Sequence, residues 1–168
     1  MRTFRVLAGR STLETEVHSS IHPIHAKSSE LTGVIEGDFD ETGHPRLDSP
    51  HLGKVRVTVE SIRSGSRLND MEMQRRAEVG RYPTISFEIG RVMSAGDGQY
   101  RGSITVTAHG RTRTVQNEFA MRVDGRQLTA TGQHTFDMRD FGMQPPRIFS
   151  LRVSPEVRVK VRLVAEEA

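Results

Sequence analysis

The chain of 168 residues contains no cysteine. It therefore has no disulfide framework and no thiolate metal site, and its composition gives no indication of the redox compartment. A chain of this length can bury one core but not comfortably two, so we expect a single domain over residues 1–168.

Long apolar runs are also absent from the sequence. The opening segment, MRTFRVLAGR, has one short apolar run that Arg5 and Gly9 interrupt, and it lacks the apolar core of a signal peptide. No later stretch approaches the length of a membrane span. We therefore expect a cytoplasmic protein without stable membrane insertion.

Apolar content is low, with 35% hydrophobic and 5% aromatic residues. Such a composition can describe a disordered chain, but here the charges nearly cancel to +3 and alternate with apolar residues. This alternation favours a folded sheet. The sequence pI of about 9.8 raises the question of nucleic-acid binding. Acidic residues separate the arginines, and no stretch resembles an RNA-binding strand, so nucleic acid is not an expected partner.

Alternation of apolar and polar side chains is what the sequence has in abundance. Leu13 and Val17 alternate with Glu14 and Glu16, which is the period of a strand with one face in water. The same pattern recurs along the chain, and glycine-containing turns separate the later repeats. The segments expected to form strands are residues 11–21, 32–40, 54–62, 84–92, 100–109, 112–123, 127–136 and 156–164.

One segment, residues 69–80, has the pattern of a helix instead. Asn69 or Asp70 is the expected N-cap and Gly80 the expected stop, with good helix formers between them. Regular strands, short turns and one helix describe an all-β up-and-down antiparallel barrel or a sandwich. The barrel is favoured because closure removes exposed edges.

Several motifs, in a consistent order, resemble the YceI-like family. They are GVIEGDF (33–39), VESI (59–62), Asn69-Asp70, RYPTISF (81–87), YRG (100–102), GRTR (110–113) and FDMRDFGM (136–143). The resemblance covers most of the chain. It implies a lipocalin-like barrel of about eight strands, often a homodimer, whose long apolar channel binds isoprenoid chains such as polyprenyl diphosphates or quinones.

The chain also departs from the family pattern. The usual aromatic followed by a His-Ser pair is reduced to Arg10-Ser11, and the double Phe after the helix is replaced by Ala77-Glu78-Val79. Many relatives carry a secretion signal, which we do not expect here. These departures concern the ligand and the compartment more than the fold.

If the apolar side of each strand faces inward, it lines a channel. The residues expected to contact a ligand are Val17, Ile35, Phe39, Val57, Val59, Ile85, Phe87, Ile104, Val106, Asn117, Phe119, Met121, His134, Phe136 and Val159. Small residues in the same register, including Gly37, Gly102, Ala130 and Gly132, favour an open cavity, although they are also compatible with tight bends in a filled barrel. Asn117 and His134 need polar partners, which could be each other.

Arginines near the helix and one hairpin turn could meet a diphosphate headgroup with bidentate geometry. These candidates are Arg75, Arg76, Arg81, Arg111 and Arg113. Solvated surface charge is the alternative for each of them.

Catalytic and metal motifs are not recognisable. His18, His22 and His25 are the nearest approach to a metal site, but no carboxylate or thiolate completes it. There is no nucleophile elbow and no phosphate-binding glycine loop. We therefore expect a carrier of an elongated apolar ligand without catalytic residues, metal or cofactor. The alternatives are a filled barrel acting as a stress-related scaffold or interaction protein, and a small barrel enzyme.

Overall fold

The computed structural model describes residues 1–147 and 151–168. Within these residues, one antiparallel sheet of ten strands has the order β1-β4-β5-β6-β7-β8-β9-β10-β2-β3. The strands are β1 Arg2–Val6, β2 Thr12–Ser19, β3 Pro23–Ser28, β4 Thr32–Gly37, β5 Leu52–Thr58, β6 Thr84–Gly96, β7 Gln99–Ala108, β8 Arg111–Asp124, β9 Gln127–Asp137 and β10 Val153–Glu167. The helices are α1 Arg67–Arg76 and two 3-10 turns, η1 Val59–Ser61 and η2 Met138–Phe141.

The sheet closes because β1 pairs with both β4 and β10. Phe4 lies opposite Ile35 on one side and opposite Glu167 on the other. Strands β1 and β4 to β10 thus form a closed antiparallel barrel of eight strands. Within the barrel, each strand pairs with the next barrel strand along the chain. The β2–β3 hairpin lies between β1 and β4 in the sequence but outside the barrel. The expected all-β, lipocalin-like up-and-down barrel with one short α-helix is confirmed.

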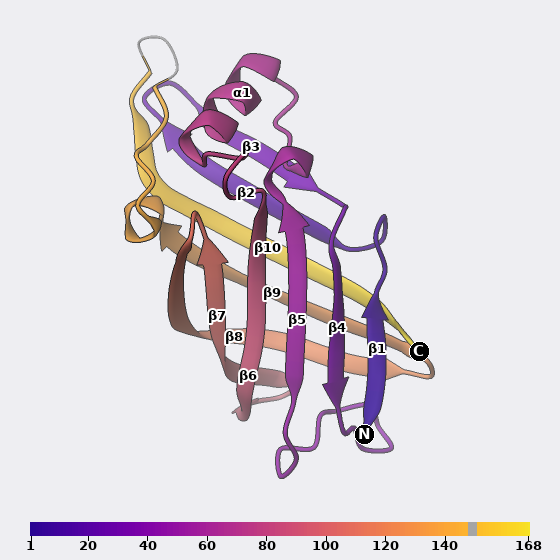
Figure 1. Ribbon diagram of the computed structural model, residues 1–168. Coiled ribbons are helices and arrows are strands. Elements are labelled where there is room, and N and C mark those ends of the chain that lie inside the picture. The colour runs from indigo at the N-terminus through magenta and orange to yellow at the C-terminus, as the bar shows by residue number, and fades with distance from the viewer. Residues whose placement is uncertain (148–150) are drawn as a thin grey trace.

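The β2–β3 hairpin extends the wall beyond the barrel. The first part of β10, Val153 to Arg162, pairs with β2, whereas its last residues pair with β1. Figure 1 shows β2 and β3 beside α1 at one end of the barrel and both termini at the other. We call these the helix end and the termini end.

Two strands were not predicted from the sequence. β1 is only five residues long, with Arg2 and Arg5 around Phe4, and β3 begins at Pro23 and contains His25 and Lys27. Neither segment has the apolar run of a typical strand, and both become strands through pairing with distant residues. Strand 54–62 was also predicted too long, because η1 follows Thr58.

The α-helix begins and ends earlier than predicted. Its N-cap is Ser66, whose hydroxyl accepts a hydrogen bond from the Asn69 amide, and its C-cap is Ala77. Asp70 instead accepts hydrogen bonds from the amide and the hydroxyl of Ser64, at 2.9 and 2.7 Å. Asp70 therefore fixes the turn that leads into the helix.

The termini end of the barrel is filled by side chains. Phe4 and Leu128 have no exposed surface, and Ile35 and Met121 are almost fully buried. Phe39, which lies after β4 rather than within it, packs edge-on against Phe4 with ring centroids 5.5 Å apart. This packing closes the barrel at that end, so any space for a ligand lies toward the helix end.

Candidate functional site

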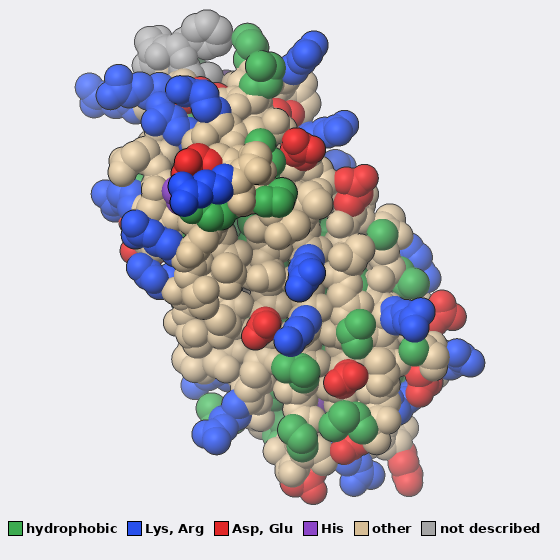
Figure 2. Space-filling model, viewed as in Figure 1, with side chains coloured by type: hydrophobic (Ala, Val, Ile, Leu, Met, Phe, Trp, Pro, Cys, Tyr) green, Lys and Arg blue, Asp and Glu red, His purple; other side chains and the backbone are tan. Residues whose placement is uncertain are grey.

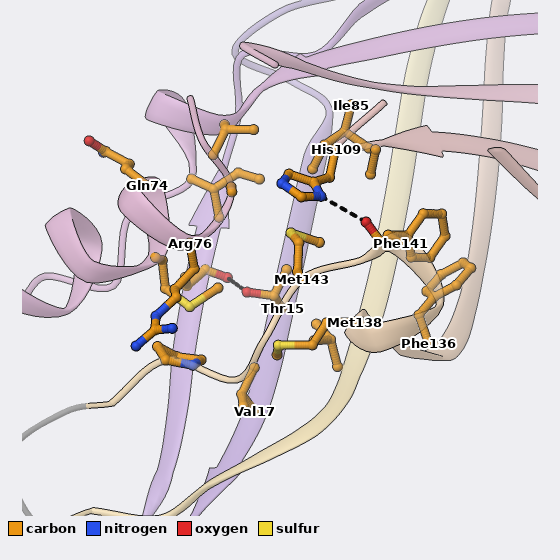
Figure 3. A pocket seen from close by; sticks show the side chains of 18 of the residues that line it. Thr15, Val17, Gln74, Arg76, Ile85, His109, Phe136, Met138, Phe141 and Met143 are labelled. Carbon is orange, nitrogen blue, oxygen red and sulfur yellow. Dashed lines mark hydrogen bonds between the residues drawn. The ribbon is translucent and has the colours of Figure 1, made fainter. Parts of the chain in front are cut away.

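A mouth cavity lies at the helix end, beneath α1. It has a volume of about 180 Å³ and is bounded by β2, β3, α1, η2 and the ends of the barrel strands. Figure 3 shows Gln74 and Arg76 of α1 on one side of it and Phe136 and Phe141 on the other. Its lining is predominantly apolar, with contributions from Met138 and Met143.

An inner cavity continues the space into the barrel. Its volume is about 90 Å³, and side chains of β5 to β10 line it. Phe87, Phe136 and Val159 line both cavities. The two cavities therefore adjoin each other at these three side chains.

Helix α1 acts as a cover over the mouth cavity rather than as part of the core. None of its residues is buried, yet Met73 of the helix and Ala77, its C-cap residue, line the cavity. Since the helix buries no apolar stripe, polar contacts must hold it in place. Glu72 supplies one of these through Arg147, because its other two partners, Arg75 and Arg76, belong to α1 itself. Its carboxylate accepts hydrogen bonds from Arg75 and Arg76 and from the backbone amide of Arg147.

The two guanidinium groups lower the pKa of Glu72 to about 2, through hydrogen bonds from Arg75 and then Arg76. The side chain is only 17% exposed. Glu72 therefore remains charged at neutral pH and ties α1 to the segment that follows η2.

His109 makes a second set of contacts that hold the cover in place. Its Nδ1 lies 2.9 Å from the carbonyl oxygen of Phe141, and its Nε2 is hydrogen-bonded to the carboxylate of Glu78. His109 and Glu78 both adopt positive φ angles, of 52° and 49°. Non-glycine residues tolerate such conformations where surrounding contacts fix them. The contact between these two residues holds the chain after α1 against the β7–β8 turn.

Asn117 and His134 contact each other inside the barrel. His134 Nδ1 lies 3.3 Å from Asn117 Oδ1. Mutual contact of these two residues was one of the alternatives that the sequence left open. Burial lowers the pKa of His134 below its ordinary value. The pair therefore presents a neutral polar contact within the apolar inner cavity.

Most of the predicted ligand residues line one or both cavities. These are Val17, Val59, Ile85, Phe87, Ile104, Val106, Asn117, Phe119, His134, Phe136 and Val159. Ile35, Phe39, Val57 and Met121 do not line either cavity. Alternation predicts that these four side chains point into the barrel, but it does not predict which end of the barrel is filled by side chains.

The five arginines do not form one rim. Arg76 lines the mouth cavity, whereas Arg75 is 69% exposed beside Glu72 and Arg81 stacks over the Tyr82 ring. Arg111 and Arg113 lie at the start of β8. The predicted cluster is thus divided between the cover and the barrel wall.

Several lining residues were missed from the sequence. Ile24 and Ala26 belong to the unpredicted β3, and Met138, Phe141 and Met143 belong to η2 and the residues after it. The apolar spacing within the FDMRDFGM motif was the available signal for this second group. From the sequence, Met138, Phe141 and Met143 contributed only to the family resemblance.

The small residues of the inner face serve different purposes. Gly132 and Ala130 line the inner cavity, but a Cβ on Gly102 would lie 3.0 Å from Phe119 Cε1 and 3.2 Å from the Arg91 carbonyl oxygen. A Cβ on Gly37 would overlap the His51 ring. Gly102 and Gly37 therefore make room for side chains rather than for a ligand.

Over residues 1–147 and 151–168, the structure groups no three His, Asp or Glu side chains that could hold a metal ion. His18 lies 3.6 Å from a carboxylate oxygen of Glu16, and His22 Nδ1 contacts the Pro23 carbonyl. In the same residues, no helix has both the length and the apolar character needed to cross a membrane.

Solved structures of similar shape share little sequence with the chain. BcnA from Burkholderia cenocepacia matches with a TM-score of 0.78 and 16% identity, covering 95% of this chain and 98% of that one. A polyisoprenoid binding domain from Saccharophagus degradans, implicated in plant cell wall breakdown, matches with a TM-score of 0.77 and 13% identity over 100% of both chains. The YceI protein of Campylobacter jejuni matches with a TM-score of 0.70 and 14% identity, covering 90% and 89%. These likenesses show a common fold.

No curated protein sequence matches the chain. The model of the YceI-like domain matches residues 5–165, which is nearly the whole sequence. The chain belongs to the YceI-like family.

Proposed function

We propose that this protein binds and carries one elongated apolar molecule, of the polyisoprenoid class, in the channel formed by the mouth and inner cavities. The observation that carries the proposal is the pair of apolar cavities that adjoin each other at Phe87, Phe136 and Val159. Such a channel suits a flexible chain, because burial contributes about 25 cal/mol per Å² of apolar surface regardless of the exact ligand. A polyisoprenoid binding domain of the same fold supports the choice of ligand class.

The size of the space is consistent with a narrow chain that enters the barrel from the helix end. Volumes of about 180 and 90 Å³ are below the roughly 300–1,000 Å³ of common small-molecule pockets. A long isoprenoid therefore enters by displacing Phe136 or extends beyond the cavities. Both routes favour a narrow chain over a bulky ring system.

The polar groups of the channel favour binding over catalysis. Asp70 accepts hydrogen bonds from Ser64, Arg76 pairs with Glu72, and His109 contacts Phe141 and Glu78. Each of these three side chains already has a protein partner, which supports a binding role over a role as an acid, a base or a nucleophile.

The experiment is a binding titration with a fluorescent isoprenoid, using two matched variants of β10. Val159 lines both cavities, whereas the next residue, Lys160, is exposed. We expect stoichiometric binding by the wild type and by Lys160→Trp, and loss of at least tenfold in affinity in Val159→Trp because an indole there fills the junction. Circular dichroism establishes that both variants are folded. Absence of binding by the wild type, or equal affinity in the two variants, would contradict the proposal.

A further inference from the structure

The barrel wall opens between β8 and β9 toward the helix end. Their pairing runs from Asp124 opposite Gln127 to Phe119 opposite Gly132. Beyond this point, residues 111–118 of β8 pair with β7, and residues 133–137 of β9 pair with β10. In the described residues the two strands do not pair again with each other, so the backbone leaves a gap that we call the side window.

Side chains frame the side window at both ends. Asn117 and His134 meet at its narrow end, two residues beyond the last paired residues of each strand. At its wide end, the η2 segment crosses from β9 to the β7–β8 turn, where Arg111 lies against Gly142. A Cβ on Gly142 would be 2.9 Å from Arg111 Cζ. The side window is therefore a bounded opening rather than a frayed edge.

The inner cavity reaches the side window. Val115 and Asn117 line it from β8, and Gln133 and His134 line it from β9. Both edges of the opening thus belong to the cavity lining. A chain held in the inner cavity can place one of its ends in this gap.

Two arginines lie on the barrel-facing side of β8 next to the side window. Arg113 lies opposite Val106, and Arg111 opposite Ala108. Opposite residues of paired strands point to the same face, and both partners are buried and line the mouth cavity. Arg111 and Arg113 are nevertheless exposed. Their side chains reach water because this part of β8 does not pair with β9.

Neither arginine has a carboxylate partner among the described residues. Two exposed arginines elsewhere are neutralised, Arg139 by Asp137 and Arg101 by Glu118. Arg76 at the mouth shares the carboxylate of Glu72. The side window is therefore the more favourable of the two openings for an anion.

We propose that the side window is the headgroup site of the channel. An anionic, phosphate-type headgroup on an apolar chain lies between Arg111 and Arg113, and its chain passes the Asn117–His134 pair into the inner cavity. Guanidinium groups bind phosphate oxygens through paired, charge-assisted hydrogen bonds, which suits this position. This inference rests on the proposed function for the apolar chain and adds the class and the location of the headgroup.

The test compares a prenyl diphosphate with the prenyl alcohol of the same chain length, together with inorganic pyrophosphate alone. The window variant is Arg111→Gln with Arg113→Gln. The control, Arg122→Gln with Arg158→Gln, removes the same charge from exposed outer positions of β8 and β10. Isothermal titration at low ionic strength gives the affinity of each protein for each compound.

We expect the wild type and the control to bind the diphosphate at least about tenfold more tightly than the alcohol, as charge-assisted hydrogen bonds predict. The window variant should lose most of this ratio while keeping its affinity for the alcohol. A ratio unchanged in the window variant would overturn the headgroup site. Pyrophosphate binding as tightly as the prenyl diphosphate would also overturn it, in favour of a site for free anions. Binding of neither prenyl compound by the wild type would overturn the proposed function as well.

Discussion

His134 and Asn117 are hydrogen-bonded at the position where the pairing of β8 and β9 ends, with 3.3 Å between Nδ1 and Oδ1. At this position the backbones of β8 and β9 are no longer hydrogen-bonded to each other, and this side-chain contact joins the two strands instead. It also places the polar pair in the lining of the inner cavity. The same two residues thus complete the barrel wall and face the proposed ligand.

The stability of the protein should depend on pH through His134. Burial lowers the pKa of this imidazole below 6.5, so the folded state binds a proton less readily than the unfolded state. The stabilisation is fully present above pH 6.5 and is lost as the pH falls from there through the lowered pKa. Urea unfolding between about pH 7.5 and pH 5.5 should show a shallower decline for His134→Gln than for the wild type. Identical slopes would contradict this role.

Phe136→Ala should join the two cavities, because Phe136 lines both. We expect a loss of about 3 kcal/mol in the free energy of unfolding and tighter binding of longer isoprenoids. Phe141→Ala is the control, since Phe141 is buried but lines only the mouth cavity. It should destabilise the protein by a similar amount without changing the preference for chain length. Titration with a series of prenyl alcohols distinguishes the two variants, and an equal shift in both would be inconsistent with Phe136 as the separator.

Gly102→Ala should destabilise the barrel. The added Cβ would lie 3.0 Å from the Phe119 ring and 3.2 Å from the Arg91 carbonyl oxygen, and overpacking of this kind costs about 1–3 kcal/mol. Gly80→Ala is a matched control, because a Cβ there meets nothing within 4 Å. Thermal unfolding should show a lower Tm for Gly102→Ala and little change for Gly80→Ala. Equal Tm values would mean that Phe119 moves aside freely.

Glu72→Gln should loosen α1 without unfolding the barrel. The variant weakens the contacts to Arg75, Arg76 and the Arg147 amide, yet partly exposed ion pairs contribute only about 0.2–1 kcal/mol to global stability. Hydrogen exchange of the α1 amides should therefore be faster, while exchange in β5 and β6 stays slow. In the wild type the same loosening is expected as the pH falls from 4.5 toward about 2, where Glu72 becomes protonated.

Glu60→Gln is the control for this experiment, because Glu60 is exposed and lies before the helix. It should leave the exchange of α1 unchanged. Equally slow exchange of α1 in Glu72→Gln would show that Glu72 does not hold the cover.

Local alternation predicted most of the strands, since a solvent-exposed and a buried face alternate every residue in segments such as 54–58 and 156–164. The choice of a barrel over a sandwich rested on the closure of exposed edges. It failed for β1 and β3, where Arg2, Pro23 and His25 interrupt the pattern and pairing with distant strands decides the outcome. The side window could not be predicted from the local pattern either, because it too depends on pairing between strands. Val115 alternates like any paired residue, and only the divergence of β9 leaves its edge open.

The outer surface of the barrel carries charges of both signs. Figure 2 shows basic and acidic side chains interspersed on the face it presents, with apolar side chains between them. Several large apolar residues are exposed, such as Val34 at 39% and Leu52 at 45%. Val34 and Leu52 lie on the same outer face of the paired strands β4 and β5, and exposed apolar residues are ordinary on a protein surface. A homodimer therefore remains an expectation from the family resemblance.

Native mass spectrometry of the purified protein, followed by organic extraction and lipid analysis, tests the central claim most directly. The account predicts one apolar molecule per chain and an isoprenoid in the extract, or uptake of one added isoprenoid per chain if the protein is purified empty. A protein that carries nothing and takes up no added isoprenoid would contradict the account and would favour a filled barrel with an interaction role.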